Sequence, residues 1–398
     1  LKVKVWDPTD VGYQPRGKQV NNPSGIWYTP VSGIWQTVWL EPVPVKYIAG
    51  IRTTPDIDRK TLRVEVDAAA AQVSDMVEVT VLDGGKEIAR AKAVNGVPVE
   101  VAMPADMKLW SPDSPFLYDL KVALVSDGKE VDRVDSYTAM RKYSTARDAD
   151  GIMRLQLNNK DIFHFGPLDQ GWWPDGLYTA ATDEALEYDV IKTKDFGFNM
   201  IRKHVKVEPA RWYTFCDRHG IMVWQDFMFA CAMYPGNQEF LDNVRQEAID
   251  NVTRIRNHPS IALWCGNNEN ALAWRYGAPG GWGWKNAFTK EEQDTVFKAY
   301  YTVFHEILPQ VVKDYTDGDD YWPSSPMAGP EPDQHGLDGT TSGDQHYWGV
   351  WHGFRPLESF DEVTTRFCSE YGFQSFPEMS TIETHRLSLS SPGLGCLK

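Results

Sequence analysis

The sequence lacks the local patterns that mark several common classes of protein. It contains no run of 18 apolar residues, so no membrane-spanning helix is predicted. Its 40 Lys and Arg residues against 55 Asp and Glu residues give a net charge of −15. That deficit of cations argues against nucleic-acid binding, which depends on neutralising phosphates. None of its five cysteines forms a C-x-x-C pair, which argues against a structural zinc or thioredoxin-like site.

Nucleotide-binding and targeting signatures are missing as well. No G-x-x-x-x-G-K-[ST] phosphate loop occurs, and no charged segment followed by an apolar stretch marks a signal peptide. The chain opens on Leu1 within strand-like sequence. We therefore expect a fragment of a longer soluble protein, which is periplasmic or secreted if its absent N-terminus carried a signal. The oligomeric state is left open.

The pattern of apolar residues divides the chain into three expected domains, at residues 1–44, 45–144 and 145–398. The first carries two Gly-Ile-Trp steps, beginning at Gly25 and Gly33, and predicts a few strands. These strands are too few to bury a face alone, so they are expected to be the end of a larger β-domain. The second domain alternates apolar and polar residues in "LRVEVDA", "VEVTVLD" and "LYDLKVALV", which predicts a small β-sandwich.

The third domain alternates helical segments with short apolar strands. One helix is expected to begin at a Thr182 or Asp183 cap, and the next to run from Pro209 to Gly220. Apolar residues at helical spacing predict a third, which ends before Pro259. Strands are expected near residues 161–166, 198–204, 221–227, 261–268, 320–325, 341–348 and 365–372. Nearly all-apolar strands between helices predict a parallel sheet covered on both faces.

Seven strands favour a (β/α)8 TIM barrel that is truncated after strand 7. A doubly wound sheet is the alternative, but no G-x-G-x-x-G follows the first strand. The final stretch "LSLSSPGLGCLK" has neither strand nor helix character, so an eighth strand is not expected in it. Because an open barrel leaves sheet edges unpaired, we expect the chain by itself to be marginally stable and weakly active or inactive.

Polar residues follow the expected strands at the ends that form the active-site mouth of such a barrel. In chain order they are Arg202, His204, Asp226, Asn268, Glu269, His346, Tyr347, Ser369 and Glu370. Two Glu residues that end different strands suit a retaining glycosidase, in which one carboxylic acid protonates the leaving oxygen and one carboxylate attacks the anomeric carbon. The alternative is structural: Glu269 caps the next helix, and Glu370 lies in a solvated loop.

Four ordered motifs resemble glycoside hydrolase family 2: "GIWQTVWLEP", "LWSPDSPFLYDL", "RNHPSIALWCGNNEN" and "RFCSEYGFQSFP". The resemblance implies a jelly-roll domain, an immunoglobulin-like sandwich and a catalytic barrel. It also implies that Glu269, preceded by Asn268, is the general acid/base and that Glu370 is the nucleophile. Asn268 would bind the sugar 2-hydroxyl. No metal or cofactor is expected, because a mechanism with two carboxylates needs none.

The other strand-end residues are expected to support this pair. We expect Arg202 to keep Glu370 ionised, and Tyr347 to hydrogen-bond Glu370. A raised pKa is expected for Glu269, since Glu370 is a like charge nearby. Gly266 is expected to let the backbone turn outward. The remaining candidates for substrate binding are His204, Trp224, Asp226, His346, Trp348 and Trp351.

The resemblance differs along the chain, which bears on the substrate. From residue 221 to about 380 it is closest to the β-mannosidase branch, through "VWQDFMFACAMYP", "YWPSSP" and "GDQHYWGVWHG". Before about residue 215 the sequence is more similar to β-galactosidase or β-glucuronidase-like members. The leading interpretation is a retaining exo-β-mannosidase. The alternatives are a β-galactosidase or related family member, and a truncated carbohydrate-binding protein without activity.

Overall fold

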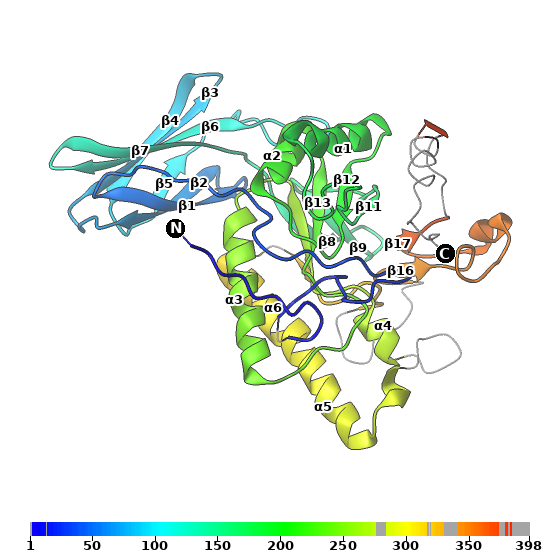
Figure 1. Cartoon of the computed structure of the whole chain (residues 1–398). Coiled ribbons are helices and arrows are strands. Elements are labelled where there is room, and N and C mark those ends of the chain that lie inside the picture. Colours follow the sequence, from blue (N-terminus) through cyan, green and yellow to red (C-terminus); the bar gives the residue numbers. More distant parts are fainter. Residues whose placement is uncertain are drawn as a thin grey trace.

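The computed structural model describes residues 2–12, 14–275, 284–316, 318, 320–329, 341–373, 379, 380 and 383. Its strands and helices form a β-sandwich, residues 47–138, and an α/β part, residues 168–373. Figure 1 shows the sandwich at one end of the molecule and the α/β part beside it. The final stretch from residue 387, where no eighth strand was expected, lies outside the described residues.

The sandwich packs two antiparallel sheets face to face. One has the order β1-β2-β5 and the other β4-β3-β6-β7. Their strands are β1 (Tyr47–Asp56), β2 (Thr61–Ala69), β3 (Met76–Asp83), β4 (Lys86–Val94), β5 (Val99–Ala102), β6 (Tyr118–Ser126) and β7 (Lys129–Thr138). Alternate residues face inward, so Leu62 and Val64 of β2 meet Val79 and Val81 of β3, all fully buried. The period-2 patterns in the sequence predicted this sandwich correctly.

In the sequence, a short antiparallel sheet comes between the sandwich and the parallel strands. It has the order β10-β9-β8 and consists of β8 (Tyr143–Arg147), β9 (Met153–Leu157) and β10 (Lys160–Asp161). The strand expected near residues 161–166 is not the first parallel strand. That place is taken by β11 (Leu168–Asp169), which pairs with β12 (Met200–Lys203). Gly166 allows the close approach, because a Cβ there would lie 1.6 Å from the carbonyl oxygen of Met200.

The α/β part contains two parallel sheets. Five strands have the order β11-β12-β13-β14-β15, with β13 at Met222–Asp226, β14 at Ile261–Cys265 and β15 at Tyr321–Trp322. The strands β16 (Gln345–Tyr347) and β17 (Cys368–Tyr371) form a separate parallel pair. Six of the seven expected strand positions therefore coincide with parallel strands, and every residue of β12, β13 and β14 is buried.

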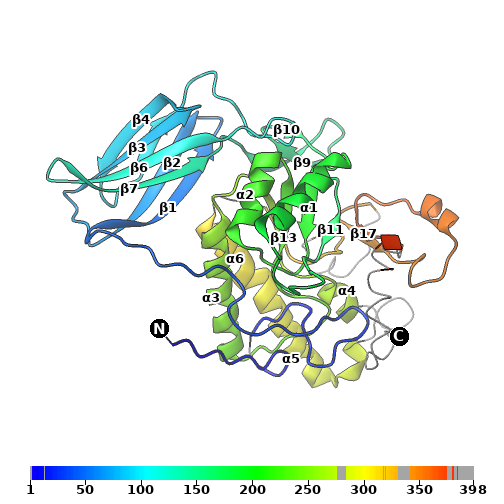
Figure 2. The same ribbon diagram turned by 45° about the horizontal axis from the view of Figure 1, so that its top comes forward.

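The three expected helices form where their sequence signals lie. Helix α1 (Asp183–Asp195) is capped by Thr182, whose side chain accepts a hydrogen bond from the Ala185 N–H. Helix α2 (Ala210–His219) follows Pro209 and ends at Gly220 in the left-handed conformation. Helix α3 (Gln238–Ile255) buries the five residues that carry its apolar spacing. Figure 2 shows α1 and α2 lying together beside the parallel strands.

Later helices connect β14 to the remaining strands. They are α4 (Asn270–Arg275), a 3-10 turn (Trp284–Ala287), α5 (Lys290–Tyr301), a π-helical turn (Thr302–Ile307), α6 (Leu308–Tyr315) and a 3-10 turn (Leu357–Glu362). Helix α5 begins with a capping box between Thr289 and Glu292. Among the described residues, no helix is long and apolar enough to cross a membrane.

The described residues of the N-terminal segment, 2–12 and 14–46, run along the α/β part before the chain enters β1 (Figures 1 and 2). Its described residues form an isolated bridge, Gln19 to Tyr28, instead of the strands expected for residues 1–44. The segment is held by its contacts: the Gly17 N–H donates to the Met228 carbonyl at 3.1 Å, and Tyr28 stacks on Trp172 with ring centroids 4.3 Å apart. A lone extended segment without partner strands cannot complete a ladder.

Polar contacts join the sandwich to the α/β part. The Trp110 indole N–H donates to the carbonyl oxygen of Asp217 in α2 at 2.8 Å, and the Tyr137 hydroxyl donates to the Asp217 carboxylate at 2.6 Å. The side chain of Asn257 donates to the Ile51 carbonyl at 2.7 Å. Trp110 and Asp217 are fully buried, so the contact between the sandwich and α2 excludes water.

Candidate active site

The ends of the parallel strands bring Glu269 and Glu370 together, 101 residues apart in the sequence. Glu269 follows β14, and Glu370 belongs to β17, where it pairs in register with His346. Both are buried, at 6% and 7% exposure. One oxygen of each carboxylate and a ring nitrogen of His346 all lie within 4.8 Å of one another. Glu370 is a buried residue of a strand and does not lie in a solvated loop, whereas Glu269 does directly precede a helix, since its carbonyl accepts a hydrogen bond from the Ala273 N–H at 2.8 Å.

The backbone at Glu269 is shaped by neighbouring strands. Glu269 has a φ of +64°, a conformation uncommon for a residue with a side chain and frequent at functional sites. Its N–H donates to the Ser325 carbonyl at 2.8 Å, which fixes that geometry. Gly266 serves a purpose other than the expected outward turn. A Cβ there would lie 2.4 Å from the Pro323 carbonyl oxygen and from the Tyr321 hydroxyl, so the glycine permits close packing.

Arg202, at 2% exposure, connects three strand ends through its guanidinium group. Its Nη1 donates to Glu370 Oε1 at 2.9 Å, and its Nη2 donates to Asp226 Oδ2 and to Asn268 Oδ1, both at 3.0 Å. Trp224 lies under the guanidinium group, with the ring centroid 5.0 Å from Cζ. The predicted contact between Arg202 and Glu370 is confirmed. Trp224 supports the arginine, and Asp226 neutralises it.

His346 lies between the two carboxylates. Its Nδ1 is 2.9 Å from Glu269 Oε1 and 3.3 Å from Glu370 Oε2. On the other side of the ring, Nε2 is 3.0 Å from Ser325 Oγ. The imidazole side chain is 1% exposed. Burial lowers the pKa of His346, but the two carboxylates outweigh it and raise the pKa above its ordinary value.

These contacts reverse the expected order of the two carboxyl pKa values. Burial acts to raise the pKa of Glu269, but the hydrogen bond and charge of His346 outweigh it and lower the pKa to about 2. Burial also raises the pKa of Glu370, and here it exceeds the opposing effects of His346 and Arg202. The sequence prediction of a raised pKa at Glu269 is therefore wrong, because it considered the like charge and not the intervening His346.

The prediction that Tyr347 hydrogen-bonds Glu370 is also wrong. The Tyr347 hydroxyl donates to Ser359 Oγ at 3.0 Å. Adjacent residues of a strand point to opposite faces of the sheet, so His346 of β16 faces the carboxylates and Tyr347 faces the 3-10 turn that contains Ser359. Trp348 and Trp351 lie farther along, both half-buried, and Trp351 packs against Phe373 with ring centroids 5.9 Å apart.

His204 is a buried histidine with spare hydrogen-bonding capacity. Its Nδ1 is 3.3 Å from Asp226 Oδ2 and 3.7 Å from Glu370 Oε1, and neither ring nitrogen has a hydrogen-bond partner of good geometry. Burial lowers its pKa to about 3, so the ring is neutral. Because Nδ1 faces the Asp226 carboxylate, Nε2 is the ring nitrogen that remains available to a bound molecule.

Four further residues complete the site, and sequence reasoning missed all of them: Lys18, Cys231, Ser325 and Asp344. Burial raises the pKa of the Cys231 thiol well above its usual range, so the sulfur keeps its proton and donates to Glu269 Oε2 at 3.4 Å. Asp344 and Ser325 lie behind His346. Lys18 comes from the N-terminal segment, and its charge acts on Glu269 and Glu370. Cys231 lies in "FACA" and Ser325 in "SSP", and neither stretch has a local pattern that predicts a contact with these carboxylates or with His346.

Glu269, His346 and Glu370 are also the group of possible metal ligands that the described residues bring together. A proton on His346 Nδ1 explains the same short distances, because it makes that nitrogen a hydrogen-bond donor to both carboxylates. The guanidinium of Arg202 at 2.9 Å from Glu370 opposes a second positive ion there. The arrangement fits proton transfer and nucleophilic attack by carboxylates better than metal binding.

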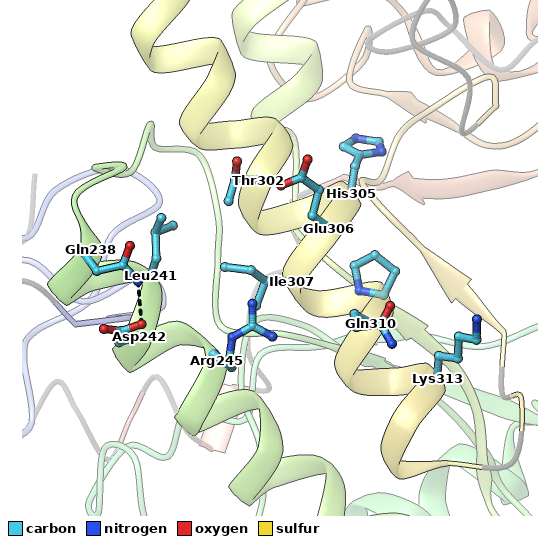
Figure 3. Close-up of a pocket in the computed structure, with 11 residues that line it drawn as sticks. Gln238, Leu241, Asp242, Arg245, Thr302, His305, Glu306, Ile307, Gln310 and Lys313 are labelled. Atoms are coloured by element: carbon cyan, nitrogen blue, oxygen red, sulfur yellow. Dashed lines mark hydrogen bonds between the residues drawn. The ribbon is translucent and has the colours of Figure 1, made fainter.

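A separate groove lies on the helical side of the α/β part (Figure 3). It runs between α3 and the helical stretch from Thr302 to Lys313, and its lining is mixed in charge. The dashed line in Figure 3 marks the hydrogen bond from Gln238 to Asp242, at 2.7 Å. The groove contains none of the strand-end carboxylates, so it is unrelated to the chemistry of the pair.

Comparison with known sequences places both parts of the chain in one family. Residues 46–141 match the family described as "Glycosyl hydrolases family 2", and residues 154–295 match "Glycosyl hydrolases family 2, TIM barrel domain". Beta-mannosidase B of Aspergillus terreus is 32% identical over 381 residues, which cover 88% of this chain and 42% of that protein. Beta-mannosidase B of Thermothelomyces thermophilus is 30% identical over 376 residues, which cover 89% of this chain and 42% of that protein.

Comparison with solved structures agrees. The beta-D-mannosidase of Dictyoglomus thermophilum superposes with a TM-score of 0.74 at 30% identity, covering 89% of this chain and 43% of that one. A beta-glucuronidase of Bacteroides uniformis shares the fold, with a TM-score of 0.58 at 17% identity over 87% of this chain and 40% of that one. The chain thus spans less than half the length of these relatives.

The fold and the two family matches define a β-domain followed by the TIM-barrel domain of a glycoside hydrolase. The chain belongs to the glycosyl hydrolases of family 2, near the β-mannosidase branch.

Proposed function

We propose that this chain carries the catalytic centre of a retaining exo-β-glycosidase, with a terminal β-mannoside as its substrate. The observation that supports it is the buried pair Glu269 and Glu370, with carboxylate oxygens within 4.8 Å of each other. Retaining glycosidases hold their two carboxyl groups about 5–5.5 Å apart, whereas inverting ones need about 6.5–9.5 Å to admit a water molecule. The similarity to beta-mannosidases supports the choice of sugar.

In this mechanism Glu370 attacks the anomeric carbon, and the bond from that carbon to the leaving oxygen breaks. Glu269 gives the leaving oxygen a proton, which restores a neutral alcohol. Glu269 then takes a proton from water, whose oxygen attacks the same carbon and releases Glu370. Arg202 orients Glu370 through the 2.9 Å contact. Asn268 and His204 are the proposed hydrogen-bond partners of the sugar hydroxyls. The aromatic residues Trp348 and Trp351 are proposed to line the outer part of the sugar-binding site.

The pKa directions assign the two limbs of a bell-shaped pH profile. Glu370 must be ionised to attack, so activity is lost as the pH falls through its raised pKa. Glu269 needs a proton, and the proposed source is His346, whose Nδ1 is 2.9 Å from Glu269 Oε1. Activity is therefore lost again as the pH rises and that shared proton dissociates, at a raised pKa.

The test compares Glu269→Ala and Glu370→Ala in the protein as its gene encodes it. Glu269→Ala is expected to keep kcat/KM for 2,4-dinitrophenyl β-mannoside, whose leaving group needs no proton, and to lose kcat/KM for alkyl mannosides, while kcat falls for both because water loses its base. Glu370→Ala is expected to lose turnover of both substrates. Glu358→Ala, an exposed glutamate of the 3-10 turn, is the control. Equal loss of kcat/KM on both substrates for Glu269→Ala would contradict its role as the acid. Faster turnover of β-galactosides or β-glucuronides than of β-mannosides would show that mannose is the wrong sugar.

A further inference from the structure

Asp344 is a buried carboxylate behind the candidate site, and it accepts hydrogen bonds from four groups. Ser325 Oγ and Ser369 Oγ donate to Oδ2 at 2.6 and 2.5 Å. The Trp322 indole N–H and the Met327 N–H both donate to Oδ1 at 2.9 Å. Asp344 is 3% exposed and Ser325 is fully buried. A carboxylate accepts and does not donate, so each of these hydrogens points at Asp344.

This arrangement fixes the direction of the next hydrogen bond. Ser325 has one hydroxyl hydrogen, and its shortest contact directs that hydrogen to Asp344. Ser325 Oγ therefore faces His346 Nε2, at 3.0 Å, with a lone pair. The bond forms only if Nε2 carries a hydrogen. The other ring nitrogen faces two carboxylate oxygens, Glu269 Oε1 and Glu370 Oε2, and it too must carry a hydrogen unless a carboxyl group supplies one.

We propose that Asp344, acting through Ser325, is a positioning residue that locks a hydrogen on His346 Nε2, so that the second ring proton is shared between His346 Nδ1 and Glu269. The proposal rests on the proposed function and deepens it. With Nε2 occupied, a proton bound by the ring is held on the side that faces the acid/base. It moves 2.9 Å from Nδ1 to Glu269 Oε1 when Glu269 is to act as an acid, and it returns when Glu269 takes a proton from water.

The charges around the ring support a doubly protonated state. The groups that face it are Glu269 after β14, Glu370 on β17, Arg202 on β12, and Asp344 through Ser325. Three of these are carboxylates and one is a cation, so the surroundings favour a positive ring. His204 also follows β12, but it faces Asp226 and Glu370. The raised pKa of His346 agrees with this count.

A direct test observes the ring itself. Histidine labelled with 15N is incorporated into the protein as its gene encodes it, and the signal of His346, one of nine histidines, is assigned by its loss in His346→Gln. At pH 7 we expect both ring nitrogens of His346 to be protonated. A ring with an unprotonated Nε2 between pH 5 and 8 would overturn the proposal. This measurement needs no turnover, so it remains decisive even if Glu269 or Glu370 proves dispensable for activity.

Two substitutions separate positioning from general support. Ser325→Ala removes the acceptor of Nε2–H, which weakens the protonated ring, so the alkaline limb of kcat/KM on an aryl mannoside should move down by about one pH unit. Asp344→Asn offers an amide donor to Ser325, which turns the serine hydrogen toward Nε2 and should abolish the doubly protonated signal. Ser324→Ala is the matched control, since the buried Ser324 donates to Asn267 and not toward His346. If Ser324→Ala and Ser325→Ala move the limb equally, the locking role is refuted.

Discussion

Removing the guanidinium of Arg202 tests how much the strand-end network stabilises the fold. Arg202→Met deletes the donors to Asp226, Glu370 and Asn268, all buried. Asp226 is fully buried and keeps only the neutral His204 ring at 3.3 Å. Removing one partner of a buried ion pair costs about 3–5 kcal/mol, because the other charge is left uncompensated. We expect that loss here.

The measurement is urea unfolding followed by circular dichroism. With a slope of about 3 kcal/mol per molar urea, the midpoint should fall by about 1 M or more. Adding Asp226→Asn to Arg202→Met removes the stranded charge and should recover about half of the loss. Arg211→Met is the matched control: Arg211 pairs with Asp183 at the surface, where such a pair contributes less than about 1 kcal/mol. If Arg202→Met moves the midpoint no more than Arg211→Met, or if Asp226→Asn recovers nothing, the network does not carry this stability.

Two further predictions concern individual buried groups. Burial lowers the pKa of His164 to about 4, so its stabilising contribution is complete above pH 6.5 and is lost as the pH falls toward 4; between pH 7 and 5 the loss is about 2 kcal/mol. The substitution His164→Gln should flatten the pH dependence of unfolding, and an unchanged slope would contradict this. Cys231→Ala removes the thiol donor to Glu269 and should raise the alkaline limb of the pH profile by a few tenths of a unit. The control is Cys216→Ala in α2, and a shift of the limb to lower pH in Cys231→Ala would count against the thiol contact.

Local patterns predicted most of the fold, because helices and buried strands are set by nearby residues. The spacing in α3 and the caps of α1 and α2 were sufficient to place those helices. The sequence prediction placed the first parallel strand too early, because the apolar residues around Phe163 and Phe165 have the pattern of a strand. In the structure those two rings are 64% and 48% exposed, and the parallel pairing begins after Pro167.

The strand-end residues of the candidate site were predictable from the sequence, but their connections and the residues that support them were not. Strand ends of a barrel converge, so Glu269 and Glu370 could be named from the sequence alone. The contact of His346 with Glu269 joins positions 77 residues apart, and Cys231 reaches Glu269 across 38. No local pattern encodes which side chain lies between two carboxylates. That missing contact is the reason the pKa order of the pair was predicted the wrong way round.

The N-terminal segment has a consequence for how the molecule is assembled during synthesis. Gly17 is made 211 residues before Met228, whose carbonyl group it binds, and Tyr28 is made well before Trp172, on which it stacks. At about 5–20 residues per second, the ribosome needs about 10–40 s to produce the docking surface for Gly17. During that interval the segment is undocked, with the side chains of Trp6, Trp39 and Leu40 exposed to water. These three side chains are also exposed in the folded chain. Its docking is therefore a late event in folding. Until the segment docks, the positive charge of Lys18 does not act on Glu269 and Glu370.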